Sequence, residues 1–215
     1  QLISRTHFSV STDETRAHLN SALFQCEAGR VRMVTTDGHR LSKMEIPLTN
    51  LDARTTMLLP LKAITELRRL TDEITTGRDT TILKIRQTGP NAFFDLHDIR
   101  FSVKLAVVLG GTALLGDVQF PPYEQVIPAV TDRAIRAPRV PFSDALRAVS
   151  LAANDRTGGV KLAAAENVLR VTSESPESGN GFDELEVDYA GPEVTVGFNA
   201  RYLLDVLAAI DSDAI

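Results

Sequence analysis

The side chains that could carry acid–base or metal chemistry are scattered along the chain. They are three of the four histidines and two aspartates: His18, His39, His97, Asp37 and Asp98. No pair of them has the His-Glu-x-x-His spacing of a zinc site, and the sequence has neither a Gly-rich phosphate loop nor a nucleophile elbow. Histidines without such a motif are usually structural, so we predict no catalytic residue, no metal and no cofactor. An unrecognised enzyme is kept as an alternative.

The stretch TTDGHRLSK, residues 35–43, places an imidazole and a guanidinium directly after a turn signal. It lies between runs that alternate apolar and polar residues, and Asp37-Gly38 is typical of a two-residue hairpin whose central residues both have positive φ. A hairpin requires neither His39 nor Arg40. Either both side chains are solvated, or they form the edge of a binding surface.

The elements that would position this stretch follow a repeated pattern. Residues 12–29, TDETRAHLNSALFQCEAG, have apolar side chains at 19, 22, 23 and 26, which predicts an amphipathic helix after a strand-like THFSVS. Three more strand–helix pairs are expected: TTMLLP with LKAITELRRL, PRVPF with SDALRAVSLAAN, and EVTVGFN with ARYLLDVLAAI. Alternating β-rich runs lie between them, and SESPESGNGFDE is expected to be a polar surface loop. The pattern predicts an α+β fold.

Length and composition favour two domains. The 215 residues are 43% hydrophobic and 24% charged, and proline and charge cluster after Pro128, so we predict domains at 1–128 and 129–215. The net charge of −5 argues mildly against a surface coated with nucleic acid but not against a local basic lining. No apolar run is long enough to span a membrane, so a cytoplasmic location is expected. The single cysteine, Cys26, is predicted to be buried on a helix face.

The repeated pattern and four motifs resemble the bacterial replicative sliding clamp family, the β subunit of the DNA polymerase III holoenzyme. The motifs are TTDGHRL, FPPYEQVIP, GGVKL and VGFNARYLLDVLAAI. The resemblance corresponds to the family's second domain and most of its third. It implies a DNA-clamp fold with helices on one face of the sheets, and a non-catalytic processivity factor that encircles duplex DNA without sequence preference. A truncated paralogue that acts only as a peptide-binding adaptor is the alternative.

The resemblance also implies two sets of site residues. Family members bind short peptide motifs of the replicative polymerase, the clamp loader and repair polymerases in a groove beside the junction of the second and third domains. The matching residues here are Leu19, Thr36, Gly38, His39, Arg40, Leu41, Pro121, Gln125, Val126, Asn199 and Tyr202. The family usually has arginine where Gln125 stands, so we expect weaker peptide affinity. The family lines its ring with helices, and the side chains expected to face duplex DNA are Arg16, His18, Lys62, Arg68, Arg69, Arg147 and Arg201.

In the family, the ring is a head-to-tail homodimer in which the first domain of one protomer meets the third domain of the other. Because the chain resembles no first domain, we expect it to be monomeric on its own, associated with the nucleoid and without membrane contact. The apolar run 106–117 stands where the family has a short connection, and it is expected to be an insertion or an aggregation-prone loop.

Overall fold

The computed structural model describes residues 1–27, 29–48, 54–75, 82–108, 120–129, 134–154 and 157–215. The chain divides into two compact units, Gln1–Ile127 and Pro128–Ile215. Most of the apolar run 106–117 lies outside the described residues, so the structure does not test the prediction made for it. No helix among the described residues is long and apolar enough to cross a membrane.

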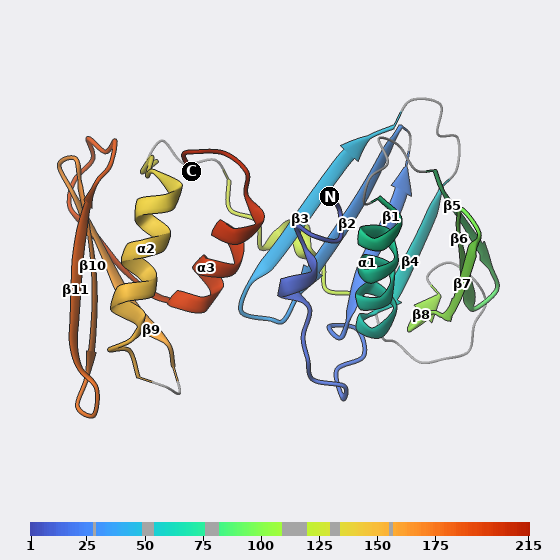
Figure 1. Ribbon diagram of the computed structural model, residues 1–215, viewed down its shortest axis with the longest axis horizontal. Helices are drawn as coiled ribbons and strands as arrows, with labels where there is room; N and C mark the ends of the chain where they lie inside the picture. Colours follow the sequence, from blue (N-terminus) through green and yellow to red (C-terminus); the bar gives the residue numbers. More distant parts are fainter. Residues whose placement is uncertain (28, 49–53, 76–81, 109–119, 130–133, 155–156) are drawn as a thin grey trace. The chain divides into compact units, whose positions relative to one another are not determined.

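The described residues of the first unit form two antiparallel sheets and one long helix (Figure 1). The larger sheet has the order β3-β2-β1-β4-β8, with strands β1 Ser21–Glu27, β2 Arg30–Thr36, β3 Leu41–Pro47, β4 Thr55–Pro60 and β8 Val107–Val108. The smaller sheet has the order β5-β6-β7, with strands β5 Leu83–Thr88, β6 Asn91–Leu96 and β7 Ile99–Lys104. Helix α1, Leu61–Thr75, directly follows β4, and two short 3-10 turns are η1 His7–Ser9 and η2 Tyr123–Gln125.

Apolar residues are buried on both faces of the larger sheet. On one face, Phe24 and Met57 pack with Ile64 and Leu67 of α1 and with Phe94 of the smaller sheet. This arrangement explains the amphipathic spacing of α1, because the helix needs only one apolar stripe to cover the sheet. The opposite face carries a second, smaller cluster, described below with the site it supports.

The predicted helix at residues 12–29 is wrong, because the apolar part of that segment is the central strand β1. Leu23 pairs with both Val34 of β2 and Leu58 of β4, so this strand is hydrogen-bonded on both sides. Ala22 and Phe24 face the α1 side of the sheet while Leu23 faces the other side. A strand that is buried on both faces has a nearly continuous apolar run, which also matches a helical spacing.

Two other predictions for this region, for Cys26 and for the THFSVS segment, are also corrected. Cys26 is buried as predicted, but it lies in β1 rather than on a helix. The strand expected at THFSVS is replaced by turns and η1, in which Val10 N–H bonds to the carbonyl of His7.

The second unit has one antiparallel sheet with two helices packed on one face (Figure 1). The sheet order is β11-β10-β9-β12, with strands β9 Gly159–Ala165, β10 Val168–Ser175, β11 Gly179–Glu186 and β12 Val194–Asn199. The helices are α2 Arg139–Ser150 and α3 Ala200–Ala209. Leu146 and Val149 of α2 and Leu207 of α3 pack against the sheet.

Two predictions in this unit are corrected. The expected strand PRVPF is mostly the first turn of α2, with Pro138 forming only an isolated bridge to Ala214. The expected loop SESPESGNGFDE is a hairpin in which Ser175 pairs with Gly179, so β10 and β11 extend almost to the turn. Burial alternates along the end of β10, where Ser173 and Ser175 are buried and Glu174 is exposed, because one face of the hairpin is open to solvent.

Candidate functional site

The β2–β3 hairpin ends in a four-residue turn, not the predicted two-residue one. Thr36 pairs with Leu41, which leaves residues 37–40 in the turn. Gly38 has a φ of +95°, but Asp37 is not among the residues with positive φ, so the turn is not type I′. Asp37 Oδ1 accepts hydrogen bonds from the backbone N–H groups of His39 at 2.9 Å and Arg40 at 3.0 Å. The aspartate therefore closes the turn with its side chain, as in an Asx turn.

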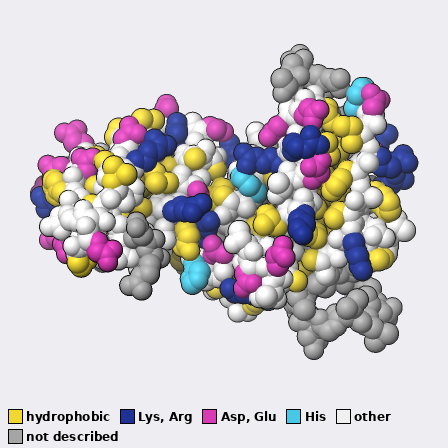
Figure 2. Space-filling model, turned by 60° about the horizontal axis from the view of Figure 1, so that its bottom comes forward, with side chains coloured by type: hydrophobic (Ala, Val, Ile, Leu, Met, Phe, Trp, Pro, Cys, Tyr) yellow, Lys and Arg dark blue, Asp and Glu magenta, His cyan; other side chains and the backbone are white. Residues whose placement is uncertain are grey.

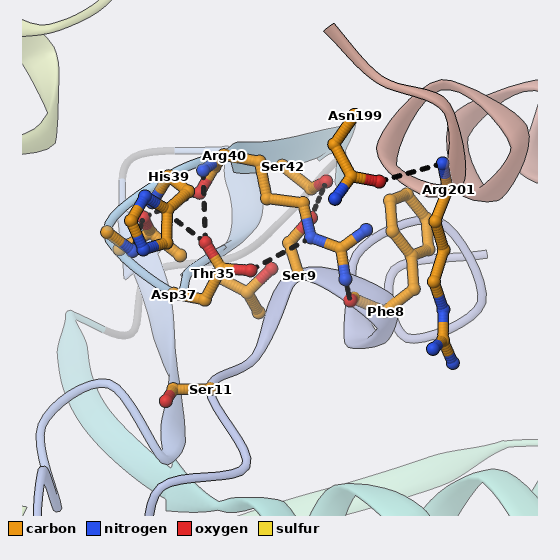
Figure 3. A network of polar contacts seen from close by, with 12 residues as sticks. Phe8, Ser9, Ser11, Thr35, Asp37, His39, Arg40, Ser42, Asn199 and Arg201 are labelled. Atoms are coloured by element: carbon orange, nitrogen blue, oxygen red, sulfur yellow. Dashed lines mark hydrogen bonds and ion pairs between the residues drawn. The ribbon is translucent and has the colours of Figure 1, made fainter. Parts of the chain in front are cut away.

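Arg40 joins this turn to the preceding segment of the chain (Figure 3). Its Nε donates to Asp37 Oδ2 at 3.0 Å, and its Nη2 donates to the backbone carbonyl of Phe8. The guanidinium also lies 5.8 Å from the centre of the Phe8 ring, within the range of a cation–π contact. The Arg40 side chain is only 18% exposed. Arg40 is therefore a structural anchor of the turn rather than a solvated side chain.

Buried hydroxyl groups hold the same segment against the hairpin. Ser9 and Ser42 share a 2.7 Å hydrogen bond between their Oγ atoms, and Thr35 Oγ1 donates to the carbonyl of Thr6 at 2.6 Å. All four residues are buried. Because a buried polar group without a partner is costly, these bonds fix the segment in one register along β2 and β3.

Gly38 allows Arg16 to lie close to the turn. A Cβ atom at Gly38 would stand 3.2 Å from Arg16 Nη2, and Arg16 Nη1 bonds to the Asp37 carbonyl at 3.4 Å. Glycine is thus favoured by its positive φ, and a Cβ atom there would displace the Arg16 guanidinium by a few tenths of an ångström.

An apolar cluster supports the turn from the second face of the sheet. Leu41 packs against a cluster formed by Leu23, Val34, Leu58, Phe120 and Tyr123. The Tyr123 hydroxyl accepts from Arg32 Nη1 at 2.8 Å and donates to Gln25 Oε1 at 3.3 Å. Burial raises the pKa of Tyr123, so the phenol stays protonated and keeps both bonds. The segment that contains η2 is thereby fixed to the hairpin.

Arg32 extends this network to β3. Its Nε donates to Glu45 Oε2 at 2.7 Å, and this hydrogen bond lowers the pKa of Glu45 below its ordinary value. No feature of the sequence assigned a role to Arg32, Tyr123 or Phe8. Arg32 lies 91 positions from Tyr123, Tyr123 lies 98 from Gln25 and Phe8 lies 32 from Arg40, and a short motif does not reveal such contacts.

The predicted peptide-binding residues of the first unit differ in exposure. Leu19 is 2% exposed and Thr36 is 8% exposed, and Thr36 Oγ1 donates to the Arg40 carbonyl at 2.6 Å. Gly38, His39, Gln125 and Val126 are exposed, with Val126 at 69%, whereas Leu41 and Pro121 are half-buried. The predicted peptide-binding residues of this unit thus fall into two groups. Those on the hairpin turn and η2 are accessible to a ligand, whereas Leu19 and Thr36 are buried and support the turn from inside.

Asn199 and Tyr202, the predicted peptide-binding residues of the second unit, lie where β12 meets α3. Asn199 is the N-cap of α3: its Oδ1 accepts from Arg201 N–H at 2.9 Å (Figure 3), and its Nδ2 donates to the Thr157 carbonyl at 2.9 Å. Tyr202 is half-buried in the first turn of α3. The cap and the tyrosine are therefore positioned by the same helix start.

Five of the seven side chains predicted to face DNA lie on helices: Lys62, Arg68 and Arg69 on α1, Arg147 on α2, and Arg201 on α3. Arg16 and His18 do not, because they belong to the turns before β1.

The cations of α1 and α2 are paired with carboxylates. Arg69 is 2.7 Å from Glu66 and 2.9 Å from Glu73, and Arg147 is 3.1 Å from Asp144. Lys62 and Arg68 have longer pairs, at 3.7 Å to Glu14 and 3.8 Å to Asp72. The three cations of α1 thus lie among four carboxylates. The negative charges weaken the positive electrostatic potential that the cations produce at a distance.

The histidines considered for catalysis are not brought together. Within the described ranges, no three His, Cys, Asp or Glu side chains are grouped closely enough to hold a metal ion. His97 lies 3.1 Å from Asp98 in the two-residue turn between β6 and β7, where its φ is +50°. This pair is explained by the turn.

Two family models match the chain in the order of its two units. The DNA polymerase III beta subunit central domain matches residues 1–106, and the C-terminal domain of the same subunit matches residues 124–215. The chain belongs to the DNA polymerase III beta subunit family. The resemblance drawn from the motifs is thereby confirmed, as is the α+β DNA-clamp fold.

Relatives of this beta-subunit chain are longer than the chain itself. The beta sliding clamp of Escherichia coli strain K12 is 31% identical over 215 residues, which is 100% of this chain and 55% of that protein. The solved beta subunit of Pseudomonas aeruginosa is 28% identical, with a TM-score of 0.87 over 99% of this chain and 54% of its own. A Bartonella birtlesii sliding clamp bound to griselimycin is 33% identical, with a TM-score of 0.85 over 99% and 55%. The chain thus spans about half the length of the relatives it matches.

Proposed function

We propose that this chain is the peptide-docking part of a DNA polymerase processivity clamp and that it has no catalytic activity of its own. The observation that carries the proposal is the β2–β3 turn, which holds His39 in the open on a frame fixed by Asp37, Arg40 and Phe8. Preorganised surfaces of this kind bind peptides with little loss of conformational entropy. The partners are short Leu- and Phe-containing motifs of a replicative polymerase, a clamp loader and repair polymerases.

Each exposed or half-buried residue has a chemical role in this proposal. Leu41, Pro121 and Val126 supply apolar area, and the Tyr202 ring and the His39 imidazole supply flat surfaces with a polar end. The inner residues Leu19 and Thr36 act through the frame, because their side chains are buried. Gln125 is exposed and uncharged, so it adds no charge-assisted bond to the peptide.

Duplex DNA is the second proposed partner, through the helices. The cations of α1 and α2 sit beside carboxylates, whereas Arg201 has no carboxylate partner among the described residues. Such a surface attracts phosphates weakly and without reading sequence, which suits a protein that slides. The same pairing around α1 favours the alternative function, a peptide-binding adaptor that does not encircle DNA.

Titration of a labelled peptide containing Leu and Phe into wild type, His39→Ala and Tyr202→Ala tests the docking proposal. Truncation of a central contact should weaken binding by about 1 kcal/mol or more, without changing the unfolding midpoint. Lys43→Ala, an exposed position on strand β3 beyond the turn, is the matched control and should bind like wild type. Equal affinities for wild type and both site variants, or no binding to wild type, would contradict the proposal.

A further inference from the structure

The outward face of the small sheet β5-β6-β7 carries residues to which neither proposed function assigns a role. Strand alternation sends Ile85, Phe94 and Phe101 inward to the core around α1. The opposite face carries side chains in three cross-strand rows: Lys84–Asp95–Arg100, Arg86–Phe93–Ser102 and Thr88–Asn91–Lys104. Four of these nine side chains are cations and one is an anion, in a protein whose net charge is −5.

The single carboxylate cannot neutralise the four cations. Asp95 accepts from Arg100 Nε at 2.7 Å and from Arg86 Nη2 at 2.9 Å, and the Arg100 bond lowers its pKa, so it stays ionised. It therefore holds the two guanidinium groups side by side across β6. No carboxylate among the described residues lies within ion-pair distance of Lys84 or Lys104. In Figure 2, dark blue side chains lie at the right-hand edge, where Figure 1 places this sheet.

An aromatic ring stands in the middle of these cations. Phe93 is half-buried and is not among the residues of the unit's apolar clusters. Its cross-strand neighbours on this face are Arg86 and Ser102. The ring therefore lies between the Arg86 side chain and the small Ser102, and it remains partly exposed.

We propose that this face binds single-stranded nucleic acid, with a base stacked on Phe93 and phosphates held by Lys84, Arg86, Arg100 and Lys104. Aromatic rings on a sheet with cations around them bind single strands without sequence preference, since every base has a stacking face. The rows of Lys84 and Lys104 are four residues apart along the strands, about 13 Å, so the face accommodates a short run of nucleotides. A duplex would leave Phe93 unused because its base faces are covered, and so would an acidic peptide. The proposal is independent of peptide docking and of the helix cations.

Fluorescence anisotropy with a labelled oligo(dT) at low salt tests this site. Two variants remove its two components: Phe93→Leu keeps apolar area but removes the π face, and Lys84→Ala/Lys104→Ala removes two cations. The matched control Lys43→Ala/Lys161→Ala removes two exposed strand lysines from other sheets. We expect each site variant to weaken binding at least about fivefold and the control to stay within about twofold. The double variant should also reduce the slope of log K against log salt by about 1.4, since each phosphate contact on a single strand contributes about 0.7.

Competition and folding controls make the outcome decisive. Unfolding midpoints within error of wild type show that Phe93→Leu keeps the fold, and an excess of unlabelled duplex should displace the oligo(dT) poorly. Equal binding by wild type and both site variants would overturn the proposal, as would equally strong displacement by duplex or by poly-glutamate. Peptide affinity measured on the same variants should not change, so failure of this site and failure of the docking proposal are distinguishable.

Discussion

At the residue scale, the adjacent residues His39 and Arg40 have different roles. The sequence offered the same two interpretations for both, because nothing in TTDGHRLSK separates them. In the structure Arg40 is bonded to Asp37 and to the Phe8 carbonyl, whereas His39 is exposed. The contact that separates them joins residues 32 positions apart, and residue type and spacing do not predict it.

Arg40→Ala should therefore destabilise the first unit, and His39→Ala should not. Loss of the guanidinium removes the donor to the Phe8 carbonyl and to Asp37 Oδ2, which costs about 1–3 kcal/mol. Arg40→Lys should recover only part of this, because an ammonium group cannot reproduce the planar fork. Urea unfolding of the three variants measures the effect, with His39→Ala expected within about 0.5 kcal/mol of wild type. An Arg40→Ala midpoint equal to that of wild type would show that the bonds to Asp37 and Phe8 contribute nothing.

At the element scale, the sequence predicted helices better than it predicted the strands before them. Helices α1 and α3 have apolar residues on one face only, and their patterns predicted them. Strand β1 was missed because it is buried on both faces, and its apolar run fits a helix as well as a strand. The pairing partners that decide between the two, β2 and β4, are not visible in the local pattern.

The start of α3 gives a prediction that belongs to this scale. Asn199→Ala removes the cap acceptor for Arg201 N–H and the donor to Thr157, and should destabilise the second unit by about 1 kcal/mol. Asn199→Asp keeps the cap oxygen and loses only the donor, so it should fall between Ala and wild type. Thermal unfolding followed by circular dichroism measures both. If the two variants unfold at the same temperature, the cap oxygen has no measurable role.

At the scale of the whole molecule, the motif resemblance identified the family that the fold and the family models then supported. It succeeded where periodicity failed because several short motifs in a fixed order are specific even when the local structure is ambiguous. The assignment of individual residues to peptide or DNA remains a prediction, and the burial of Leu19 and Thr36 limits those two to supporting roles within it.

Duplex DNA binding by the 215-residue chain should be weak, indifferent to sequence and steeply lost with salt. The helix cations are few and mostly paired with carboxylates, so counterion release supplies nearly all of the affinity. Anisotropy with two unrelated duplexes between about 50 and 200 mM salt measures both properties. Tight binding that favours one duplex would be incompatible with a sliding surface.

The central claim is that peptides dock on the β2–β3 turn and the neighbouring η2 segment, with Asn199 and Tyr202 of the second unit as further predicted contact residues. Hydrogen–deuterium exchange of the chain with and without a saturating Leu- and Phe-containing peptide locates the contact directly. Because a bound peptide excludes water and restrains local opening, we expect added protection at residues 36–41, 123–127 and 199–203 and little change on β5-β6-β7. Protection confined to other segments, with the peptide shown to be bound, would contradict the claim.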